Sequence, residues 1–283
     1  MSGHRACGSD QLSQPTPFTV ALDGARLAGI EAGEGLPVVF LHAGVADKRI
    51  WARQVTFLAQ HGYRALAYDR RGYGESQAEP EAEFAHLDDL EDVLDAQGIR
   101  AAVLVGNSMG GGLAIDFALA NPERVAGLVL IGTAVSGAPE AELSEDVMPM
   151  IHAMQDAEER GDLNLLNAVI AHAWLDGPLS PNGRVGGEAR ALFLDMNGKA
   201  LAHPELTGED ESLPAYDDLA DIETPTLLLV GDLDFPDIVA LHEELSETLP
   251  NAFAMVLEGV AHLPSLEKPE LFESILLEFL QAL

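Results

Sequence analysis

The segment that decides the fold reads Ala101-Ala-Val-Leu-Val-Gly-Asn-Ser-Met-Gly-Gly-Gly112. Its first part, residues 101–105, is a continuous apolar run, which is typical of a strand buried on both faces of a sheet. A helix is predicted directly after it, so Ser108 lies on a sharp strand-to-helix turn that lifts its hydroxyl out of the sheet. Gly106 and Gly110 leave room for the two backbones to approach each other. The segment therefore predicts a serine nucleophile at the end of a buried strand.

Buried strands alternate with helices on both sides of this turn. An antiparallel hairpin, residues 18–22 and 26–31, opens the series around the two-residue turn Asp23-Gly24. Alternation of this kind predicts an α/β fold with a mostly parallel sheet flanked by helices. The later strands are expected at residues 37–41, 64–68, 125–131, 226–230 and 252–257, and the helices near 50–60, 109–120, 236–249 and 269–280.

The strand pattern stops between residues 136 and 222. Apolar residues there recur three and four positions apart, which indicates helices. This pattern predicts a helical insertion within one domain. The expected organisation is a loose polar tail over 1–17, a core formed by 18–135 and 223–283, and the insertion over 136–222.

Charge and composition exclude several classes of partner. The chain has 47 acidic and 15 basic residues, a formal net charge of −32. A field of that sign repels nucleic acid and anionic lipid, so we expect neither as a partner. The single cysteine, Cys7, cannot form an internal disulfide, and we find neither a signal peptide nor an apolar run of membrane-spanning length. We therefore expect a cytoplasmic protein, and the acidic surface fits either a high-salt cytoplasm or genomic base composition.

Five segments resemble motifs of the α/β-hydrolase superfamily and follow in that family's order. The resemblance covers almost all of the chain from Phe18 onward. It implies a nucleophile elbow at Ser108 and a helical cap, to which residues 136–222 correspond. The five segments are Phe40-Leu-His-Ala-Gly44, Asp69-Arg-Arg-Gly-Tyr-Gly-Glu-Ser76, Gly106-Asn-Ser-Met-Gly-Gly111, Leu229-Val-Gly-Asp-Leu-Asp234 and Gly259-Val-Ala-His-Leu-Pro264.

A serine hydroxyl becomes a nucleophile only when an oriented base removes its proton. In this family the chain order is Ser, acid, His, which implies His262, in the loop after the last strand, as the base. Asp232 and Asp234 both qualify as the acid from the residues alone, because positions two apart on an extended segment face the same side. The family pattern favours Asp234 and leaves Asp232 to support the loop.

Acyl transfer also needs donors for the oxyanion that forms on the carbonyl oxygen. One donor is the backbone N–H of Met109, at the start of a helix where the partial positive charge helps. The family usually has His-Gly in the loop that supplies the second donor, and this chain has His42-Ala43-Gly44 instead. Aligning on His42 implies Gly44 as that donor. We expect His42 itself to brace the loop rather than to act in catalysis.

The segment from Asp69 to Ser76 also matches the family. Its chemistry indicates a tight turn in which Asp69 and Arg71 pair with each other, a structural role.

The substrate is expected to be a small neutral molecule. Met and aromatic side chains of the insertion suit an adaptable apolar pocket. Between residues 137 and 223 there are 19 acidic and four basic residues, a net −15, which disfavours anionic substrates. A preference for a carboxylate would instead point to Arg184 or Arg190 in the pocket. The candidate lining residues are His42, Trp51, Met148, Met154 and Trp174.

The residues thus predict a serine hydrolase, of the carboxylic ester hydrolase kind, that cleaves an ester, lactone or related acyl bond through an acyl-enzyme. A serine at the elbow excludes the dehalogenase and epoxide-hydrolase chemistry of the superfamily, which uses aspartate there. No metal-ligand spacing, dinucleotide motif or P-loop is present, so we expect no metal and no cofactor. Two alternatives remain open: a cofactor-free perhydrolase or haloperoxidase-like enzyme, and a small-ligand receptor on the same fold.

Overall fold

The strands of this computed structural model, which describes residues 14–141, 143–209 and 214–283, form one nine-stranded sheet. Their order is β1-β2-β4-β3-β6-β7-β8-β9, with β5 pairing β2. Pairing is parallel from β4 through β9 and antiparallel where β2 meets β1, β4 and β5. The predicted α/β fold with a mostly parallel sheet is confirmed. The strands are β1 (Thr16–Leu22), β2 (Ala25–Ala32), β3 (Leu36–Leu41), β4 (Tyr63–Tyr68), β5 (Gln77–Ala78), β6 (Ala102–Asn107), β7 (Val125–Ile131), β8 (Thr226–Gly231) and β9 (Ala252–Leu257).

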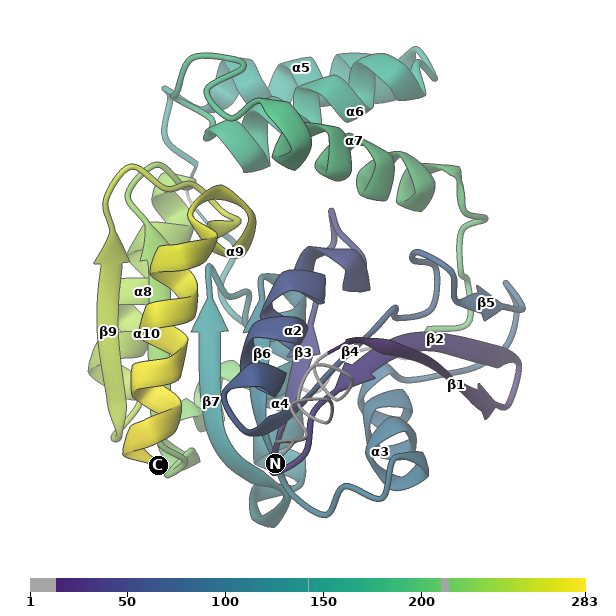
Figure 1. The fold of residues 1–283 in the computed structure, drawn as a ribbon. Coiled ribbons are helices and arrows are strands. Elements are labelled where there is room, and N and C mark those ends of the chain that lie inside the picture. The colour runs from purple at the N-terminus through teal and green to yellow at the C-terminus, as the bar shows by residue number, and fades with distance from the viewer. Residues whose placement is uncertain (1–13, 142, 210–213) are drawn as a thin grey trace, which may run out of the picture.

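Helices cover both faces of the sheet (Figure 1). Alternate residues of β3 show why its apolar run is continuous: Val39 and Leu41 pack in the same core as α3, α4 and α8, while Val38 and Phe40 pack with α2 and α10. Each core is formed by side chains from one face of the strands. The helices of these layers are α2 (Ala52–Gln60), α3 (His86–Ala96), α4 (Met109–Ala120), α8 (Pro236–Thr248), α9 (Pro264–Glu267) and α10 (Pro269–Ala282), with 3-10 turns η1 (Lys48–Trp51) and η2 (Pro122–Arg124).

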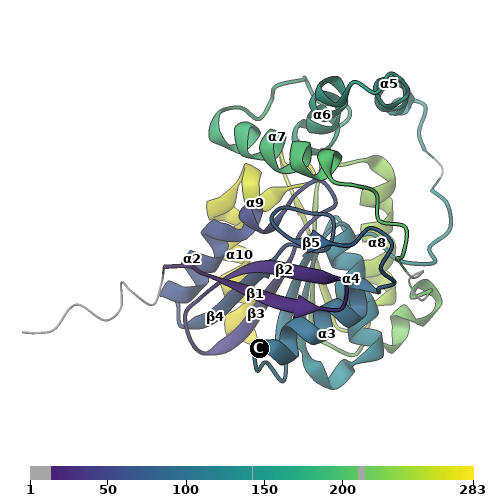
Figure 2. The same cartoon turned by 90° about the vertical axis from the view of Figure 1, so that its right-hand side faces the viewer.

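The chain between β7 and β8 is helical, as its spacing predicts. Figures 1 and 2 show α5, α6 and α7 as a separate layer beyond one end of the sheet, the end to which the arrowhead of β7 points. This end is formed by the carboxyl ends of the parallel strands, where sheets of this kind carry their active sites. Ser108 directly follows β6, so the elbow lies on the same side as this layer. Its elements are α5 (Met148–Glu159), α6 (Leu163–Ala171), a π-helical turn (His172–Asp176) and α7 (Gly187–Ala202). The chain then returns to the core, where Leu219 of η4 (Tyr216–Asp221) packs with α3, α4 and α8.

The predicted tail falls mostly outside the described residues, and Cys7 lies there with it. Strand β1 already begins at Thr16, inside the range expected for the tail, because residues from Thr16 pair with β2. No helix in the three described ranges has the length and apolar character needed to cross a bilayer.

Candidate active site

Ser108 lies between β6 and α4 in a strained backbone conformation. Its φ of 55° and ψ of −120° make it the sole non-glycine residue with a positive φ in the described ranges. Such a conformation costs on the order of 1–3 kcal/mol and persists only where the surroundings impose it. Here the N–H of Ser108 donates to the Ile131 carbonyl at 2.8 Å, and its own carbonyl accepts from Gly111 at 2.9 Å and Ala134 at 3.3 Å. The turn is thereby held on both sides.

The close approach of strand and helix predicted at this turn is confirmed. A Cβ added to Gly106 would lie 2.3 Å from the Gly110 carbonyl oxygen, and one added to Gly110 would lie 2.3 Å from the Leu41 carbonyl oxygen. Neither position can hold a side chain, since real Cβ atoms do not approach backbone that closely.

His262 and Asp234 form a buried pair. His262 Nδ1 lies 2.7 Å from Asp234 Oδ2, and the two side chains are 2% and 1% exposed. The second carboxylate oxygen, Oδ1, accepts the Phe235 N–H at 2.8 Å. Both oxygens therefore have fixed partners, and the imidazole presents Nε2 as its remaining nitrogen. No hydrogen bond joins Ser108 Oγ to this nitrogen in the described residues, and such bonds often tighten only when substrate binds.

Asp232, the other candidate acid, has a different environment. Its Oδ1 accepts the backbone N–H of Gly259 at 2.6 Å and that of Val260 at 3.3 Å. It therefore supports the loop that leads to His262, and in the described ranges no hydrogen bond joins it to the imidazole. The two aspartates, which the residue pattern left equivalent, differ clearly in geometry.

Three further residues position the pair. Gly132 has a φ of +47°, and a Cβ there would lie 2.9 Å from His262 Nδ1. Asn107, inside the elbow, donates its amide to the carbonyls of Ile131 at 2.9 Å and His262 at 3.1 Å. Glu267 accepts the N–H groups of the His262 loop. The contacts of Asn107 have no local sequence signal, because its partners lie 24 and 155 positions away, whereas Glu267 lies within six positions of the N–H groups that it binds.

Glu267 also joins the insertion to the loop that carries His262. It pairs with Arg184 while accepting the backbone N–H of Ala261 at 2.9 Å and of Leu263 at 3.1 Å. Burial raises the pKa of Glu267, against these stabilising contacts. Arg184 is thus held by a carboxylate, and Arg190 likewise by Asp176 at 2.8 Å. Arg184 and Arg190 therefore both have carboxylate partners within the protein and are not free to bind an anionic substrate.

Trp174 brings the insertion into direct contact with the candidate base. It lies on the π-helical turn, and its ring centroid is 4.5 Å from that of His262. Its carbonyl accepts the His262 N–H at 3.3 Å. Trp174 also lines the cavity at Ser108. Of the five candidate lining residues, Trp174 alone lines the Ser108 cavity.

Trp51, Met148 and Met154 do not line that cavity, which corrects the expectation for them. Trp51 is fully buried, with its ring 5.0 Å from Phe40, because the flat indole fills the core between β3 and α10. Met148 and Met154 belong to α5, where Met154 packs against the apolar cluster that contains Phe235.

His42 is fully buried and braces its loop, as expected. Nδ1 donates to the Ala43 carbonyl at 2.8 Å, and Nε2 accepts the backbone N–H of Arg70 at 3.1 Å. Burial, together with the nearby Arg70 charge, holds the pKa of His42 well below its usual value. The neutral imidazole is therefore a structural group, and it lines neither of the two cavities beside the elbow.

The two residues that carry the candidate oxyanion donors are in contact through the Met109 side chain. A Cβ added to Gly44 would lie 2.6 Å from Met109 Sδ, so the loop after β3 packs against the first residue of α4. The backbone N–H of Met109 belongs to the helix terminus, where amides lack partners within the helix.

The expected internal pair of Asp69 and Arg71 is wrong. Asp69 pairs instead with Lys48, whose Nζ lies 2.6 Å from Oδ2. It also accepts the Glu75 N–H at 2.7 Å. Arg71 extends to α3 and pairs with Asp89 at 2.8 Å. The segment is structural, but its ionic partners come from other elements.

Two cavities flank the elbow and share Ala134 and Val135. The first, of about 620 Å³, opens at Ser108, and Asp237, Glu140 and Glu244 give it an acidic wall. Burial, with the Asp234 charge nearby, raises the pKa of Asp237. The second cavity, of about 420 Å³, lies beside Met109. No group of three or more His, Cys, Asp or Glu side chains within the described ranges is arranged to hold a metal ion.

Comparison with known proteins identifies the family to which the chain belongs. A family model described as alpha/beta hydrolase fold matches residues 37–269. The chain therefore belongs to the α/β-hydrolase family and is a hydrolase.

Individual relatives have different activities. A non-heme haloperoxidase of Rhodococcus erythropolis is 31% identical, over 87% of this chain and 92% of the relative. A 2-hydroxy-6-oxo-6-(2'-aminophenyl)hexa-2,4-dienoic acid hydrolase of Metapseudomonas resinovorans is 26% identical, over 91% and 88%. The esterase RhEst1 of Rhodococcus sp. ECU1013 has a similar structure, with a TM-score of 0.73, 27% identity and coverage of 95% and 99%.

Proposed function

We propose that this protein is a serine hydrolase that cleaves a small ester, lactone or related acyl bond through an acyl-enzyme. In this proposal Ser108 is the nucleophile, His262 the base and Asp234 the acid that orients the base. The observation that carries it is the strained Ser108 elbow together with the buried His262–Asp234 pair at 2.7 Å. Residues 136–222 act as the cap over this site, and the protein works in the cytoplasm on a small molecule.

The reaction begins when Ser108 Oγ attacks the carbonyl carbon and passes its proton to His262 Nε2. Asp234 stabilises the imidazolium that forms, because its Oδ2 keeps the hydrogen bond to Nδ1. The backbone N–H groups of Met109 and Gly44 bind the oxyanion. His262 then gives its proton to the leaving group, and water, activated by the same imidazole, releases the acyl group. No metal or cofactor enters any step.

The acidic wall of the Ser108 cavity favours a neutral group on that side of the scissile bond. Asp237, Glu140 and Glu244 would repel an anion there, whereas the apolar side chains of Ile238 and Leu241 accept a hydrocarbon group. Trp174 supports this assignment, since it places an aromatic face of the cap against the candidate base.

A second candidate is cofactor-free perhydrolysis, in which peroxide rather than water attacks the acyl-enzyme. It is supported by the haloperoxidase relative, which is 31% identical to this chain. It uses the same Ser108, His262 and Asp234. Only the acceptor of the acyl group differs.

Turnover of p-nitrophenyl acetate by the wild type and by Ser108→Ala tests the proposal. We expect repeated turnover by the wild type and a fall in kcat of about 10⁴-fold in the variant, with folding intact. Repeating the assay with acetate and hydrogen peroxide measures peracetate formation and separates the second candidate. A single turnover or none would indicate a receptor, and full activity of Ser108→Ala would defeat the proposal.

A further inference from the structure

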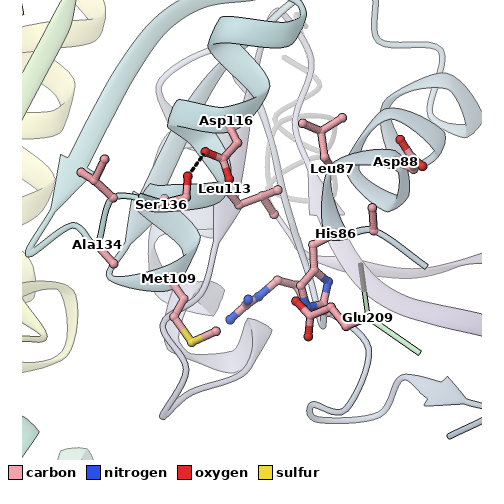
Figure 3. Close-up of a pocket in the computed structure, with 13 residues that line it drawn as sticks. His86, Leu87, Asp88, Met109, Leu113, Asp116, Ala134, Ser136 and Glu209 are labelled. Carbon is pink, nitrogen blue, oxygen red and sulfur yellow. Dashed lines mark hydrogen bonds and ion pairs between the residues drawn. The ribbon is translucent and has the colours of Figure 1, made fainter. Parts of the chain in front are cut away.

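The second cavity extends from the elbow to the start of α3. Figure 3 shows Met109 at one end, His86 and Glu209 at another, and Leu87 and Leu113 along its walls. It adjoins the Ser108 cavity at Ala134 and Val135, which line both. A substrate bound at Ser108 could therefore extend one of its two ends into this space.

Arg70 contributes a buried guanidinium to this cavity. The described ranges contain three buried cations, and two of them have carboxylate partners: Lys48 pairs with Asp69 at 2.6 Å, and Arg71 with Asp89 at 2.8 Å. Arg70, which is 2% exposed, has no carboxylate partner among the described residues.

The contacts of Arg70 leave much of its hydrogen-bonding capacity unused. One terminal nitrogen donates to the His42 carbonyl at 3.3 Å, and the guanidinium carbon lies 4.9 Å from the centroid of the Tyr73 ring. Its buried Nε has no acceptor among the described residues. An unpaired buried charge is costly, so an anionic partner at this position would be strongly stabilising.

The other titratable groups of the cavity do not neutralise this charge. Burial, reinforced by Arg70 and Arg71, lowers the pKa of His86 to about 3, so this imidazole is neutral at pH 7. Asp116 accepts the Ser136 hydroxyl, and Glu209 lies 3.6 Å from His86 with a half-exposed side chain. Asp88 is exposed, where water and salt screen its charge.

We infer that Arg70 binds a carboxylate of the substrate in this second cavity while the scissile acyl group lies at Ser108. This inference rests on the proposed function and names its substrate class: esters or lactones that carry a carboxylate on one side of the scissile bond and a neutral group on the other. The His42 carbonyl that Arg70 contacts also lies against the helix start, 2.8 Å from a Cβ added to Gly110. The guanidinium therefore lies near the first turn of α4, the helix that begins directly after Ser108.

The strongly acidic composition does not oppose this assignment. Exposed carboxylates act through water and are largely screened beyond about 8 Å at physiological ionic strength. A buried bidentate contact between guanidinium and carboxylate is screened far less. The neutral preference expected from the acidic insertion applies to the Ser108 cavity, and the carboxylate preference applies to the cavity of Arg70.

Matched ester pairs test the inference. Mono-p-nitrophenyl succinate is compared with p-nitrophenyl isocaproate, and p-carboxyphenyl acetate with p-isopropylphenyl acetate, because an isopropyl group has nearly the shape of a carboxylate. We expect the wild type to prefer the carboxylate in one pair. Arg70→Met should lower that ratio of kcat/KM by about tenfold to a hundredfold, and Arg70→Lys should lower it less. Arg160→Met, which removes an exposed cation just after the end of α5, should leave the ratio unchanged.

Binding to the Ser108→Ala protein, measured by calorimetry with the same esters, gives a readout that does not need turnover. We expect tighter binding of the carboxylate ester and loss of that advantage when Arg70→Lys or Arg70→Met is added. Equal ratios in wild type and Arg70 variants, or a preference for the isopropyl ester in both pairs, would overturn the inference while ester hydrolysis upholds the proposed function. If no ester is cleaved, the proposed function fails and the binding ratio alone decides the role of Arg70.

Discussion

Replacing Asp234 with asparagine should impair the base without disturbing the fold. The Phe235 N–H donates to Oδ1 of Asp234 at 2.8 Å, and an amide oxygen can keep that bond. The amide NH₂ of Asp234→Asn then takes the place of Oδ2, 2.7 Å from His262 Nδ1. Because an NH₂ group donates, Nδ1 must become the acceptor and the proton moves to Nε2. This tautomer cannot take the proton of Ser108.

The size of the loss follows from these contacts. The two side chains of the pair are 1% and 2% exposed, so water cannot substitute for the missing carboxylate. A wrong tautomer in a buried Ser-His-Asp site lowers kcat by about 10⁴-fold, which corresponds to about 5 kcal/mol in the activation barrier. Asp232→Asn is the matched control. Its amide oxygen can still accept the Gly259 N–H, so we expect a loss below about tenfold.

The assay is kcat/KM for p-nitrophenyl acetate with both variants across a pH series, beside the thermal unfolding of each. Equal losses in the two variants would refute the assignment of the acid. A larger loss in Asp232→Asn would reverse it.

Two further predictions follow from buried groups near the elbow. Gly132→Ala places a Cβ about 2.9 Å from His262 Nδ1 at a φ of +47°. We therefore expect the free energy of unfolding to fall by about 1–3 kcal/mol and kcat to fall by about tenfold or more. Urea unfolding and steady-state kinetics measure the two effects, and an unchanged variant would show that the loop has room to move. Because the pKa of His86 is lowered to about 3 in the folded protein, from about 6.5 when unfolded, the unfolded state binds the proton more readily. Stability should therefore fall between about pH 6.5 and pH 3, and His86→Gln should be less sensitive than wild type by about 2 kcal/mol at pH 5; parallel pH dependences would contradict this.

Much of the fold is readable from local pattern. The apolar run of β6 and the glycines after it specify a buried strand and a tight turn, and the spacing of apolar residues between β7 and β8 specifies helices. These signals are local, since each depends on residues within a few positions of one another. The serine elbow was identifiable for the same reason.

The supporting contacts were not identifiable, because they join distant parts of the chain. Asn107 meets the carbonyl of His262 across 155 positions, and Arg184 meets Glu267 across 83. Trp51 follows the loop after β3 in sequence, yet its ring packs into the core with Phe40. Proximity in sequence was the wrong guide there.

The Asp69–Arg71 expectation failed for a related reason. Two opposite charges two positions apart suggest a local pair, but Lys48 and Asp89 approach from other elements with better geometry. Arg70 lies between Asp69 and Arg71 in sequence. With both of these residues paired to other elements, it has no carboxylate partner among the described residues. The candidate carboxylate subsite at Arg70 therefore could not be predicted from the sequence, because it depends on which residues the fold brings together.

The central claim is that Ser108 is an activated nucleophile. A fluorophosphonate probe, followed by peptide mass spectrometry, tests it most directly because the probe reacts only with a serine that a neighbouring base has activated. We predict modification of Ser108 alone, none in Ser108→Ala, and much slower modification in Asp234→Asn. Modification of a different residue, or no modification of an enzyme that still turns over p-nitrophenyl acetate, would contradict the account.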